Sequence, residues 1–508
     1  MQASVGALIS QAALRFGDKT AVVFEGRTWS FAELDDLSNL TAQALVDRGV
    51  RAGDVVSLYS PNCPEWIIAY YAILKAGAVV NPLNLMLTAA EAAFAMADCG
   101  SVAVFGAAEK IAGLQACAAK TSLRDYIQFD GLAVHGAVSL YGLLEHTSLE
   151  GRFPLAGTCA EDVSTIGYTS GTTGHPKGAV LTHESILMNV AMTATLHVRN
   201  PSDVVVSALP FSHVYGNVVM NAAMGYGMTL VLHKTFDAQA ILDSIQRHRA
   251  TIFEGVPTMY MYLLEHPHLQ AFDLSSLTRC TVGGQTMPEA RMEQVEKRFG
   301  CRLLELWGMT ELGGLGTTHS LYGPRRLGSI GIPLPHQQAR IIDPATGEPV
   351  SAPGIVGELQ MRGPIVMKEY HGHPEATREV KDAQGWLHSG DLARFDEDGF
   401  IYVVDRLKDM IITAGFNIYP AELERVIAEH PGVAMVAVGS VPDASKGELA
   451  KAYIVKRQGA DVDLAQVEQH CRTRLAAYKV PRRFAFVDDL PKTASGKVMR
   501  RKLRELFE

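Results

Sequence analysis

The sequence has few cysteines for its length, and none of them form a close pair. Seven cysteines are scattered along 508 residues, and no two of them stand at CxxC spacing. Such pairs are typical of structural zinc sites and of redox centres. The sequence therefore predicts neither kind of site, and we expect the cysteines to pack in the core of a protein from a reducing compartment.

The sequence also lacks an excess of positive charge, a secretory leader and a membrane-spanning run. A formal net charge of -8 argues against a nucleic-acid partner. Residues 1–19 have no basic region followed by a long apolar run, and they predict an amphipathic helix instead. The most apolar stretch, residues 214–232, contains two asparagines and three glycines, which favours a buried core over a membrane span. We therefore expect a cytoplasmic protein.

A third absence is the GxxxxGK[ST] loop with which many ATPases hold phosphates. Residues 168–178 read YTSGTTGHPKG and combine glycines, hydroxyl side chains and one lysine. Glycines let backbone N–H groups approach an anion, hydroxyls add donors, and lysine adds a positive charge. This loop can bind the phosphates of ATP, but its composition is also typical of a polar surface turn. The candidate phosphate ligands are Thr169, Ser170, Gly171, Thr172, Thr173, Gly174 and Lys177.

The first three hundred residues predict an α/β fold. The chain is long enough for more than one folding unit, and 47% hydrophobic with 20% charged residues is typical of a globular protein. Short apolar runs alternate with segments whose apolar residues have helical spacing. Apolar strands separated by helices predict parallel sheets covered on both faces. These runs lie at residues 55–59, 102–106, 204–210, 229–233, 251–257 and 302–308.

The pattern of polar, apolar, glycine and proline residues changes after about residue 333. Residues 355–364 and 399–405 alternate in polarity between glycines and prolines, which predicts a smaller β-rich subdomain. The segment beyond residues 406–409 has the size of a separate domain and mixes helical and strand patterns, which predicts a compact α+β unit. The predicted domains are therefore residues 1–405 and 410–508, joined by residues 406–409.

Three further motifs follow the loop at 168–178. They are LWGMTE at 306–311, GWLHSGD at 385–391 and PKTASGKVMRR at 491–501. Together the four resemble the adenylate-forming superfamily, specifically its acyl-CoA synthetase (carboxylic acid:CoA ligase) branch, along nearly the whole chain. The resemblance implies a large N-terminal adenylation domain of layered α/β subdomains plus a β-rich subdomain, and a small mobile α+β C-terminal domain. It also implies ATP, Mg2+ and coenzyme A, an acyl-AMP that becomes a CoA thioester, and a homodimer.

The resemblance assigns roles in nucleotide binding to several residues. Trp307 stands where an aromatic residue, more usually tyrosine, lies against adenine, and Thr310 stands where a threonine contacts the α-phosphate. Glu311 and Thr172 stand at the positions of the family residues that bind Mg2+, and a carboxylate suits a hard cation. An isolated tryptophan after an apolar run would instead be core. The other nucleotide-site residues that the resemblance implies are Gly283, Gly284, Gln285, Glu305, Leu306, Gly308 and Met309.

Ribose and C-terminal residues follow from the same resemblance. Asp391 and Arg406 stand at the positions of family residues that contact the ribose of ATP. A surface ion pair would also explain either residue alone. Lys408 stands at the family hinge, and Lys497 stands at the lysine that bridges the acid carboxylate and the α-phosphate. The basic residues around Lys497 are also typical of a solvated face. The residues implied for CoA are Gly415 in the pantetheine tunnel and Lys446, Tyr478 and Arg482 at the CoA nucleotide.

The motif PFSHVYG at 210–216 resembles the mouth of the acyl pocket, with His213 beside the substrate carboxylate. No arginine or lysine is among the implied walls, and a buried unpaired carboxylate is costly, so we do not expect a dicarboxylate substrate. Glycines at 313, 314 and 316 are expected to leave room, which favours a medium-chain aliphatic or aromatic acid over acetate. The implied walls are Val214, Tyr215, Asn217, Glu254, Thr258, Val282, Gly283, Gly308, Leu312, Gly313 and Leu315.

Three other functions share parts of this pattern. An acyl-AMP ligase that loads a separate carrier protein is the main alternative, but the insertion typical of fatty acyl-AMP ligases is not seen around residues 365–408. A luciferase-like oxygenase shares the adenylation motifs. A non-catalytic ATP-binding regulator would have lost Glu311 or Lys497, and both are present. The sequence thus predicts an AMP-forming acyl-CoA ligase.

Overall fold

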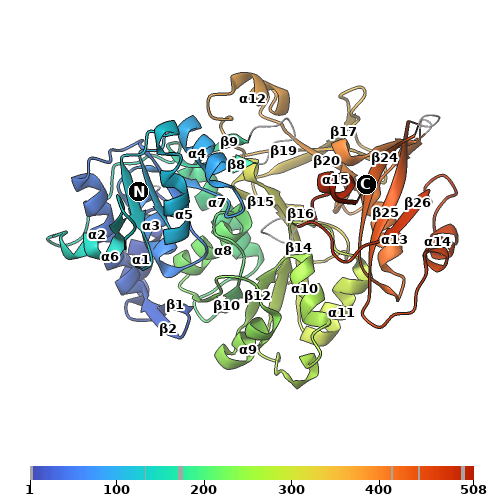
Figure 1. Cartoon of the computed structure of the whole chain (residues 1–508), viewed down its shortest axis with the longest axis horizontal. Coiled ribbons are helices and arrows are strands. Elements are labelled where there is room, and N and C mark those ends of the chain that lie inside the picture. Colours follow the sequence, from blue (N-terminus) through green and yellow to red (C-terminus); the bar gives the residue numbers. More distant parts are fainter. Residues whose placement is uncertain are drawn as a thin grey trace.

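A computed structural model describes residues 4–131, 133–169, 176–413, 416–443, 447–492 and 498–507. Within these ranges the strands form two large sheets and two five-stranded sheets. The chain runs from a blue N-terminal α/β layer through a green and yellow layer to a gold β-rich part and an orange-red C-terminal part (Figure 1). The predicted α/β architecture with a separate C-terminal α+β unit is confirmed.

The nine-stranded sheet contains most of the predicted apolar strands. It is parallel from β14 through β13, β12, β10 and β11 to β1, and antiparallel pairs close both edges. These strands are apolar because the helices that connect parallel strands cover the sheet on both faces. Its strands are β1 (Thr20–Phe24), β2 (Arg27–Ser30), β10 (Val204–Ser207), β11 (Thr229–Leu232), β12 (Ile252–Gly255), β13 (Arg279–Val282), β14 (Arg302–Met309), β15 (Gly314–Thr318) and β16 (Ile332–Pro333).

The seven-stranded sheet ends in a hairpin. Its last two strands, β8 (Val163–Thr169) and β9 (Lys177–Thr182), pair antiparallel up to Thr169 and Lys177, so they flank the predicted phosphate loop. The described parts of that loop therefore stand at the edge of a sheet. The other strands are β3 (Val55–Tyr59), β4 (Val79–Pro82), β5 (Ala103–Gly106), β6 (Asp125–Gln128) and β7 (Val138–Ser139).

Helices fill the space around these sheets. In α3 and α8 nearly every residue is buried, so both helices belong to the interior, as expected for residues 214–232. No helix in the described ranges is both long and apolar enough to cross a bilayer. The helices are α1 (Ala7–Phe16), α2 (Phe31–Asp47), α3 (Pro64–Lys75), α4 (Ala89–Asp98), α5 (Ala108–Gln115), α6 (Leu140–Glu145), α7 (His183–Leu196), α8 (Val214–Gly225), α9 (Ala238–His248), α10 (Pro257–Leu264) and α11 (Glu289–Phe299), with short 3-10 turns η1 (Ala118–Lys120), η2 (Leu269–Ala271) and η3 (Thr310–Leu312).

The β-rich part is an antiparallel sheet in the order β18, β17, β19, β20 and β21. It carries one short helix, α12 (Pro374–Val380), and its last strand leads directly into η4 (Leu407–Asp409). The strands are β17 (Gln338–Ile342), β18 (Pro349–Val350), β19 (Gly357–Arg362), β20 (Leu387–Phe395) and β21 (Ile401–Arg406).

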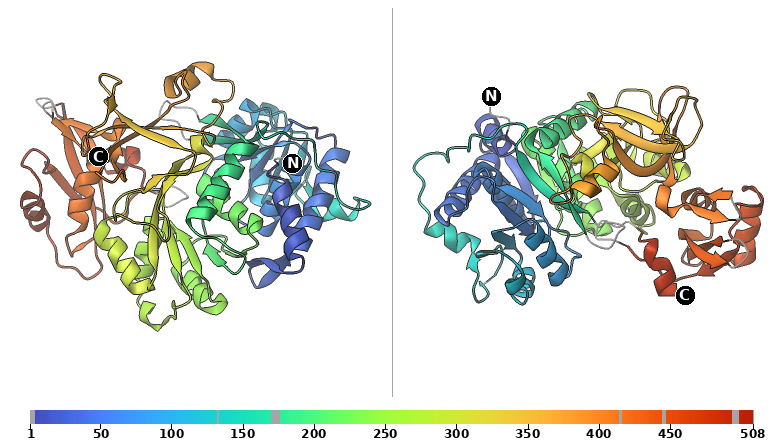
Figure 2. Two further views of the ribbon diagram at one scale, coloured as in Figure 1. Left: turned by 180° about the vertical axis from the view of Figure 1, so that it is seen from behind. Right: turned by 90° about the horizontal axis from the view of Figure 1, so that it is seen from above.

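The C-terminal part has its own hydrophobic core, which runs from Ile411 to Val480. It stands at one end of the molecule when seen from above (Figure 2). Asp405, at the end of β21, accepts hydrogen bonds from the Ala421 N–H at 2.6 Å and from the Arg500 guanidinium at 2.9 Å. Its elements are β22 (Ile411–Thr413), β23 (Phe416–Ile418), β24 (Val433–Asp443), β25 (Gly447–Lys456), β26 (Arg483–Phe486), α13 (Pro420–Ala428), α14 (Leu464–Arg472) and α15 (Arg501–Phe507).

Candidate active site

Asp391 contacts two residues, Trp307 and Arg406, that the sequence places in separate motifs. One carboxylate oxygen accepts a hydrogen bond from Trp307 Nε1 at 2.7 Å, and the other lies 2.9 Å from Arg406 Nε. Asp391 and Arg406 are also register partners on β20 and β21. Tryptophan therefore supplies a donor here in addition to the aromatic ring that the motif predicts.

Glu311 forms a second cluster at the turn after β14. Its carboxylate accepts a hydrogen bond from the Tyr370 hydroxyl at 2.7 Å, and the Lys177 ammonium lies 5.5 Å from the centre of the Tyr370 ring. Burial raises the pKa of the Glu311 carboxyl above its ordinary value, against the hydrogen bond from Tyr370. A nearby cation would therefore stabilise the ionised form.

Tyr370 is a site residue that the sequence reasoning missed. Its segment reaches the site because residues 368–371 pair with β9: the Val180 N–H donates to Glu369 O and the Lys368 N–H donates to Val180 O, both at 2.9 Å. This pairing joins positions almost two hundred residues apart, and no local pattern in the segment indicates it. An alignment of homologues would have been the signal that could find it.

The ends of β13 and β14 hold the other predicted purine-site residues. A Cβ at Gly283 would overlap the Leu306 side chain, and Gly284 has a φ of +93°, so both positions suit glycine. Gln285 and Met309 are half-buried, and Gly308 is exposed. Residues at the carboxyl ends of parallel strands commonly form ligand sites in α/β folds.

Glu305 differs from these residues because it is enclosed. It is buried on β14, and its Oε2 has no hydrogen-bond partner in the described chain. Burial, followed by the charge of Glu289, raises the pKa of its carboxyl to about 8. The folded protein therefore holds a proton here that the unfolded chain releases at lower pH.

This proton predicts a pH dependence of stability. Between about pH 5 and pH 8 the folded state binds more protons at Glu305 than the unfolded state, so the free energy of unfolding falls as pH rises. We expect the melting temperature of the wild type to decline over this range more steeply than that of Glu305→Gln, which has no proton to lose. Thermal melts of both proteins test this, and parallel pH profiles would contradict it.

The predicted acid site is a small cavity of about 60 Å³. Thr310 and Asn217 line it together with His213, which also caps α8 by accepting the Tyr215 N–H at 3.3 Å. A cavity of this size holds roughly two water molecules, since each takes about 30 Å³ in the liquid. An acid of medium size therefore requires the walls to move. The cavity is lined by Pro82, Asn84, Thr165, Gly167, Tyr168, Leu181, Ile186, Phe211, Ser212, His213, Val214, Asn217 and Thr310.

The glycines after Leu312 do not leave the room that we expected. A Cβ at Gly314 would lie 2.6 Å from Val218 Cγ2, and one at Gly316 would lie 2.7 Å from the Trp307 ring. Neighbouring side chains thus already fill both spaces, and these glycines let β15 pack closely. Gly313, with a φ of +61°, ends the η3 turn. The prediction of room was wrong at 314 and 316.

Several implied walls belong to the core instead of the cavity. Val282, Leu312 and Leu315 are buried and do not line it, and neither do Gly283 and Gly308. Tyr215 does not line the cavity either, and its hydroxyl lies 2.5 Å from Thr281 Oγ1, which donates to the fully buried Glu254 carboxylate at 2.9 Å.

Glu254 has a cationic partner that the sequence reasoning did not foresee. Arg199 Nη1 lies 2.7 Å from Glu254 Oε1, and both side chains are almost completely buried. The two charges compensate each other, as buried charges must. The pair therefore lies within the core, and neither member lines the cavity.

The predicted C-terminal residues are only partly described. Lys408 is exposed in η4, Tyr478 is exposed, and the Arg482 guanidinium donates to Ala477 O at 3.2 Å. Lys408 stands two residues after Arg406 of the Asp391 cluster, and among the described residues no hydrogen bond joins Arg482 to the Asp391 or Glu311 cluster. Outside the described residues lie Ser170, Gly171, Thr172, Thr173, Gly174, Gly415, Lys446 and Lys497.

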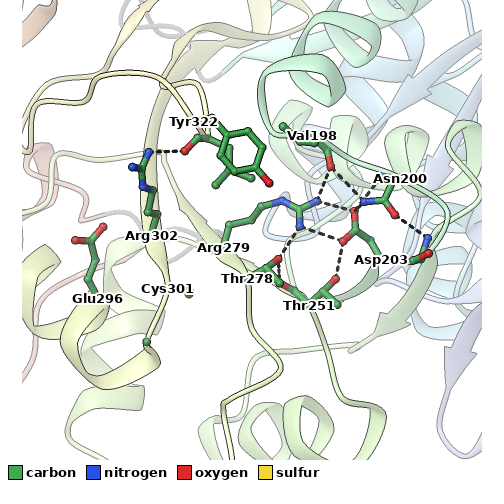
Figure 3. Close-up of a pocket in the computed structure, with 13 residues that line it drawn as sticks. Val198, Asn200, Asp203, Thr251, Thr278, Arg279, Glu296, Cys301, Arg302 and Tyr322 are labelled. Atoms are coloured by element: carbon green, nitrogen blue, oxygen red, sulfur yellow. Dashed lines mark hydrogen bonds and ion pairs between the residues drawn. The ribbon is translucent and has the colours of Figure 1, made fainter.

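A larger cavity of about 850 Å³ lies at the end of the nine-stranded sheet that is opposite the acid cavity (Figure 3). Its lining residues directly precede β10, β12, β13 and β14, so it stands at the amino ends of the parallel strands. Arg279 and Asp203 form a buried ion pair there, with 2.6 Å between nitrogen and oxygen. Because ligands of α/β sheets bind at the carboxyl ends, we assign the active site to the smaller cavity.

Comparison with known proteins identifies the family of this chain. Residues 9–371 match the model of the AMP-binding enzyme family, and residues 422–497 match the model of the AMP-binding enzyme C-terminal domain. The chain belongs to the AMP-binding enzyme family. It resembles a long-chain-fatty-acid–CoA ligase of Bacillus subtilis (strain 168), with 36% identity over 98% of this chain and 93% of the relative.

Two solved structures share the whole fold of the enzyme. Anthranilate CoA ligase AuaEII in complex with anthranoyl-AMP has a TM-score of 0.93 and 26% identity, over 99% of this chain and 96% of that chain. ATP-bound MatB from Rhodopseudomonas palustris has a TM-score of 0.91 and 33% identity, over 100% and 99%. The enzyme is therefore an acid–thiol ligase of the acyl-CoA synthetase type, as its motifs predict.

Proposed function

We propose that this enzyme converts a medium-chain aliphatic or aromatic carboxylic acid and ATP into an acyl-AMP, and then into a CoA thioester. The η3 turn carries this proposal. Thr310 lines the acid cavity, and the next residue, Glu311, accepts a hydrogen bond from Tyr370, whose ring lies beneath the Lys177 ammonium. Trp307, three residues before Thr310, donates a hydrogen bond to Asp391. One short segment thus joins an acid site to a nucleotide site.

This arrangement suits attack of a carboxylate on the α-phosphorus of ATP. A carboxylate oxygen forms a bond to phosphorus while the bond from phosphorus to the pyrophosphate oxygen breaks. The N-terminus of α8 beside His213 favours a carboxylate at this position, because its N–H groups and the helix dipole attract anions. Lys177 lies on the phosphate side, where it can stabilise the charge that moves to pyrophosphate.

Glu311 fits a role in binding Mg2+. Mg2+ is usually held by one or two carboxylates together with substrate phosphates and water, and Glu311 is a buried carboxylate beside the phosphate loop. When bound, Mg2+ would neutralise charge on the phosphates. The hydrogen bond from Tyr370 fixes the Glu311 side chain, and we propose Thr172 as a further ligand.

The second step requires a thiol at the acyl-AMP carbonyl. The thiol loses its proton, its sulfur forms the new bond to the acyl carbon, and AMP leaves. We propose residues 406–409, with Lys408, as a hinge that exchanges Lys497 for the Gly415 segment between the two steps. The contacts of Asp405 with Ala421 and Arg500 cross this segment, so rotation about it would change them.

The proposed class of acid is supported mainly by the comparisons and by the charges of the residues near the implied walls. The named relatives act on a long-chain fatty acid and on anthranilate, one aliphatic and one aromatic acid. Within the described residues, no arginine or lysine lines the acid cavity, and Arg199 near the implied wall Glu254 is paired with that carboxylate. An uncharged acyl group is therefore favoured over a second carboxylate.

A pyrophosphate-release assay over a panel of carboxylic acids, with and without CoA, tests the proposal. We expect sustained turnover with medium-chain or aromatic acids only when CoA is present. Turnover that needs an acyl carrier protein instead would favour the carrier-loading alternative. No acid-dependent pyrophosphate release with any member of the panel would contradict the proposed reaction.

The Asp391 cluster predicts a separate effect on ATP. Asp391→Ala removes the acceptor that we place at the ribose hydroxyls, and hydrogen bonds to charged groups contribute about 1.5–3 kcal/mol each, so we expect KM for ATP to rise about 10²-fold. Trp307→Phe keeps an aromatic ring but removes the donor to Asp391, for which we expect about a tenfold rise. Initial rates at varied ATP measure both, and an unchanged KM in Asp391→Ala would exclude the ribose role.

A further inference from the structure

Buried side chains of α3 and α8 form an amide network that includes Asn217, a residue of the acid cavity lining. Figure 1 labels both helices. Asn221 Nδ2 donates to the Asn217 backbone carbonyl at 3.0 Å and to Asn217 Oδ1 at 2.9 Å. Asn221 Oδ1 accepts from the Tyr71 hydroxyl at 2.9 Å, and Tyr70 reaches Asn217 Oδ1 at 3.4 Å. Both tyrosines and Asn221 are completely buried, so this network is rigidly packed.

The network determines which way the Asn217 amide points. A backbone carbonyl can only accept, so the atom of Asn221 that contacts it must be the NH2 group. This NH2 group also donates to the Tyr70 hydroxyl at 3.2 Å, which in turn donates to Asn217 Oδ1 at 3.4 Å. Both groups that face the Asn217 side chain are therefore donors, which places its Oδ1 toward the network. Its Nδ2 makes no hydrogen bond in the described chain, although Asn217 lines the cavity and is only 8% exposed. The cavity therefore has a hydrogen-bond donor without a partner.

The place of Asn217 relates this donor to the substrate carboxylate. The Asn217 N–H donates to His213 O at 2.9 Å, so Asn217 lies one helical turn after His213, and both line the cavity. One turn of α-helix is about 5.4 Å. A group bound at Nδ2 is thus about 5 Å beyond a carboxylate held at the mouth.

We propose that Asn217 selects acids that carry a hydrogen-bond-accepting oxygen in the acyl part, about 5 Å from the carboxyl carbon. A ring hydroxyl or alkoxyl group, or a keto group on an aliphatic chain, meets this description. An acid without that oxygen leaves the buried donor unpaired, and buried unpaired polar groups discriminate strongly between substrates. This inference rests on the proposed function and names the acid more narrowly.

Matched acids and matched variants test the inference. We compare kcat/KM for meta- and para-hydroxybenzoate with benzoate, and for oxo-octanoate with octanoate. In the wild type we expect at least one oxygenated acid to be preferred over its partner by about tenfold or more. Asn217→Asp keeps the acceptor for Asn221 but removes the donor, and Asn217→Leu removes both; each should reduce that preference by about tenfold.

Met220→Leu serves as the control, because Met220 is fully buried on the same helix and does not line the cavity. It should keep the wild-type preference, and thermal melts confirm that each variant is folded. Turnover with an unchanged preference in Asn217→Asp would overturn this inference alone, and so would a wild type that prefers the unsubstituted acids. Failure of every acid to give CoA-dependent turnover would overturn the proposed function and this inference with it.

Discussion

Glu311→Gln should lower the rate of acyl-AMP formation by about 10²- to 10³-fold, the usual loss when one group that stabilises transition-state charge is removed. Glutamine has the shape of glutamate and can still accept the hydrogen bond from Tyr370, so the fold at η3 should persist. It lacks the negative charge that would hold Mg2+. Pyrophosphate release measured against Mg2+ concentration should therefore also show a raised Mg2+ requirement.

Tyr370→Phe separates the charge of Glu311 from its orientation. This variant keeps the carboxylate and the ring beneath Lys177 but removes the hydroxyl donor. We expect a loss of about tenfold, which corresponds to one hydrogen bond to a charged group. An equal loss in Tyr370→Phe and Glu311→Gln would show that orientation, and not charge, is what the site requires. A wild-type Mg2+ response in Glu311→Gln would exclude Glu311 as a metal ligand.

Lys497→Ala should affect only one of the two chemical steps. In the proposed reaction Lys497 bridges the carboxylate and the α-phosphate, so its loss should slow acyl-AMP formation by about 10²- to 10³-fold. Thioester formation from supplied acyl-AMP and CoA should keep a rate close to that of the wild type, because that step does not need this cation. Rapid-mixing assays of the two half-reactions measure this split.

Lys502→Ala is the matched control for this prediction. Lys502 lies five residues further along, within α15, and carries the same charge. It should leave both half-reactions unchanged if the effect belongs to Lys497 and not to the basic segment as a whole. Comparable losses of both half-reactions in Lys497→Ala would contradict the role proposed for this lysine.

The strands and the main site clusters follow from local sequence patterns. The apolar runs at residues 204–210, 229–233 and 251–257 contain β10, β11 and β12, because short apolar segments between helices form buried parallel strands. The motifs containing Trp307 and Asp391 predict that both residues belong to one nucleotide site, and the structure brings the two side chains together. Their hydrogen bond was not predicted, since it depends on how β20 packs against β14, 84 residues away.

The acid pocket was harder to predict because its shape depends on packing between distant segments. Gly314 and Gly316 suggested open space, but Val218 and Trp307 occupy it. Glu254 is neutralised by Arg199, which stands 55 residues earlier and lies outside every motif. The free donor of Asn217 likewise depends on Tyr70 and Tyr71 of α3, so only the folded chain shows it.

Direct detection of the intermediate tests the central claim most closely. The enzyme is incubated with ATP, Mg2+ and an acid that supports turnover, and the products are followed by mass spectrometry before and after CoA is added. We expect enzyme-bound acyl-AMP to accumulate without CoA and to disappear after CoA is added, with one thioester formed for each acyl-AMP consumed. Thioester formation without any acyl-AMP, or acyl-AMP that CoA does not consume, would contradict this claim.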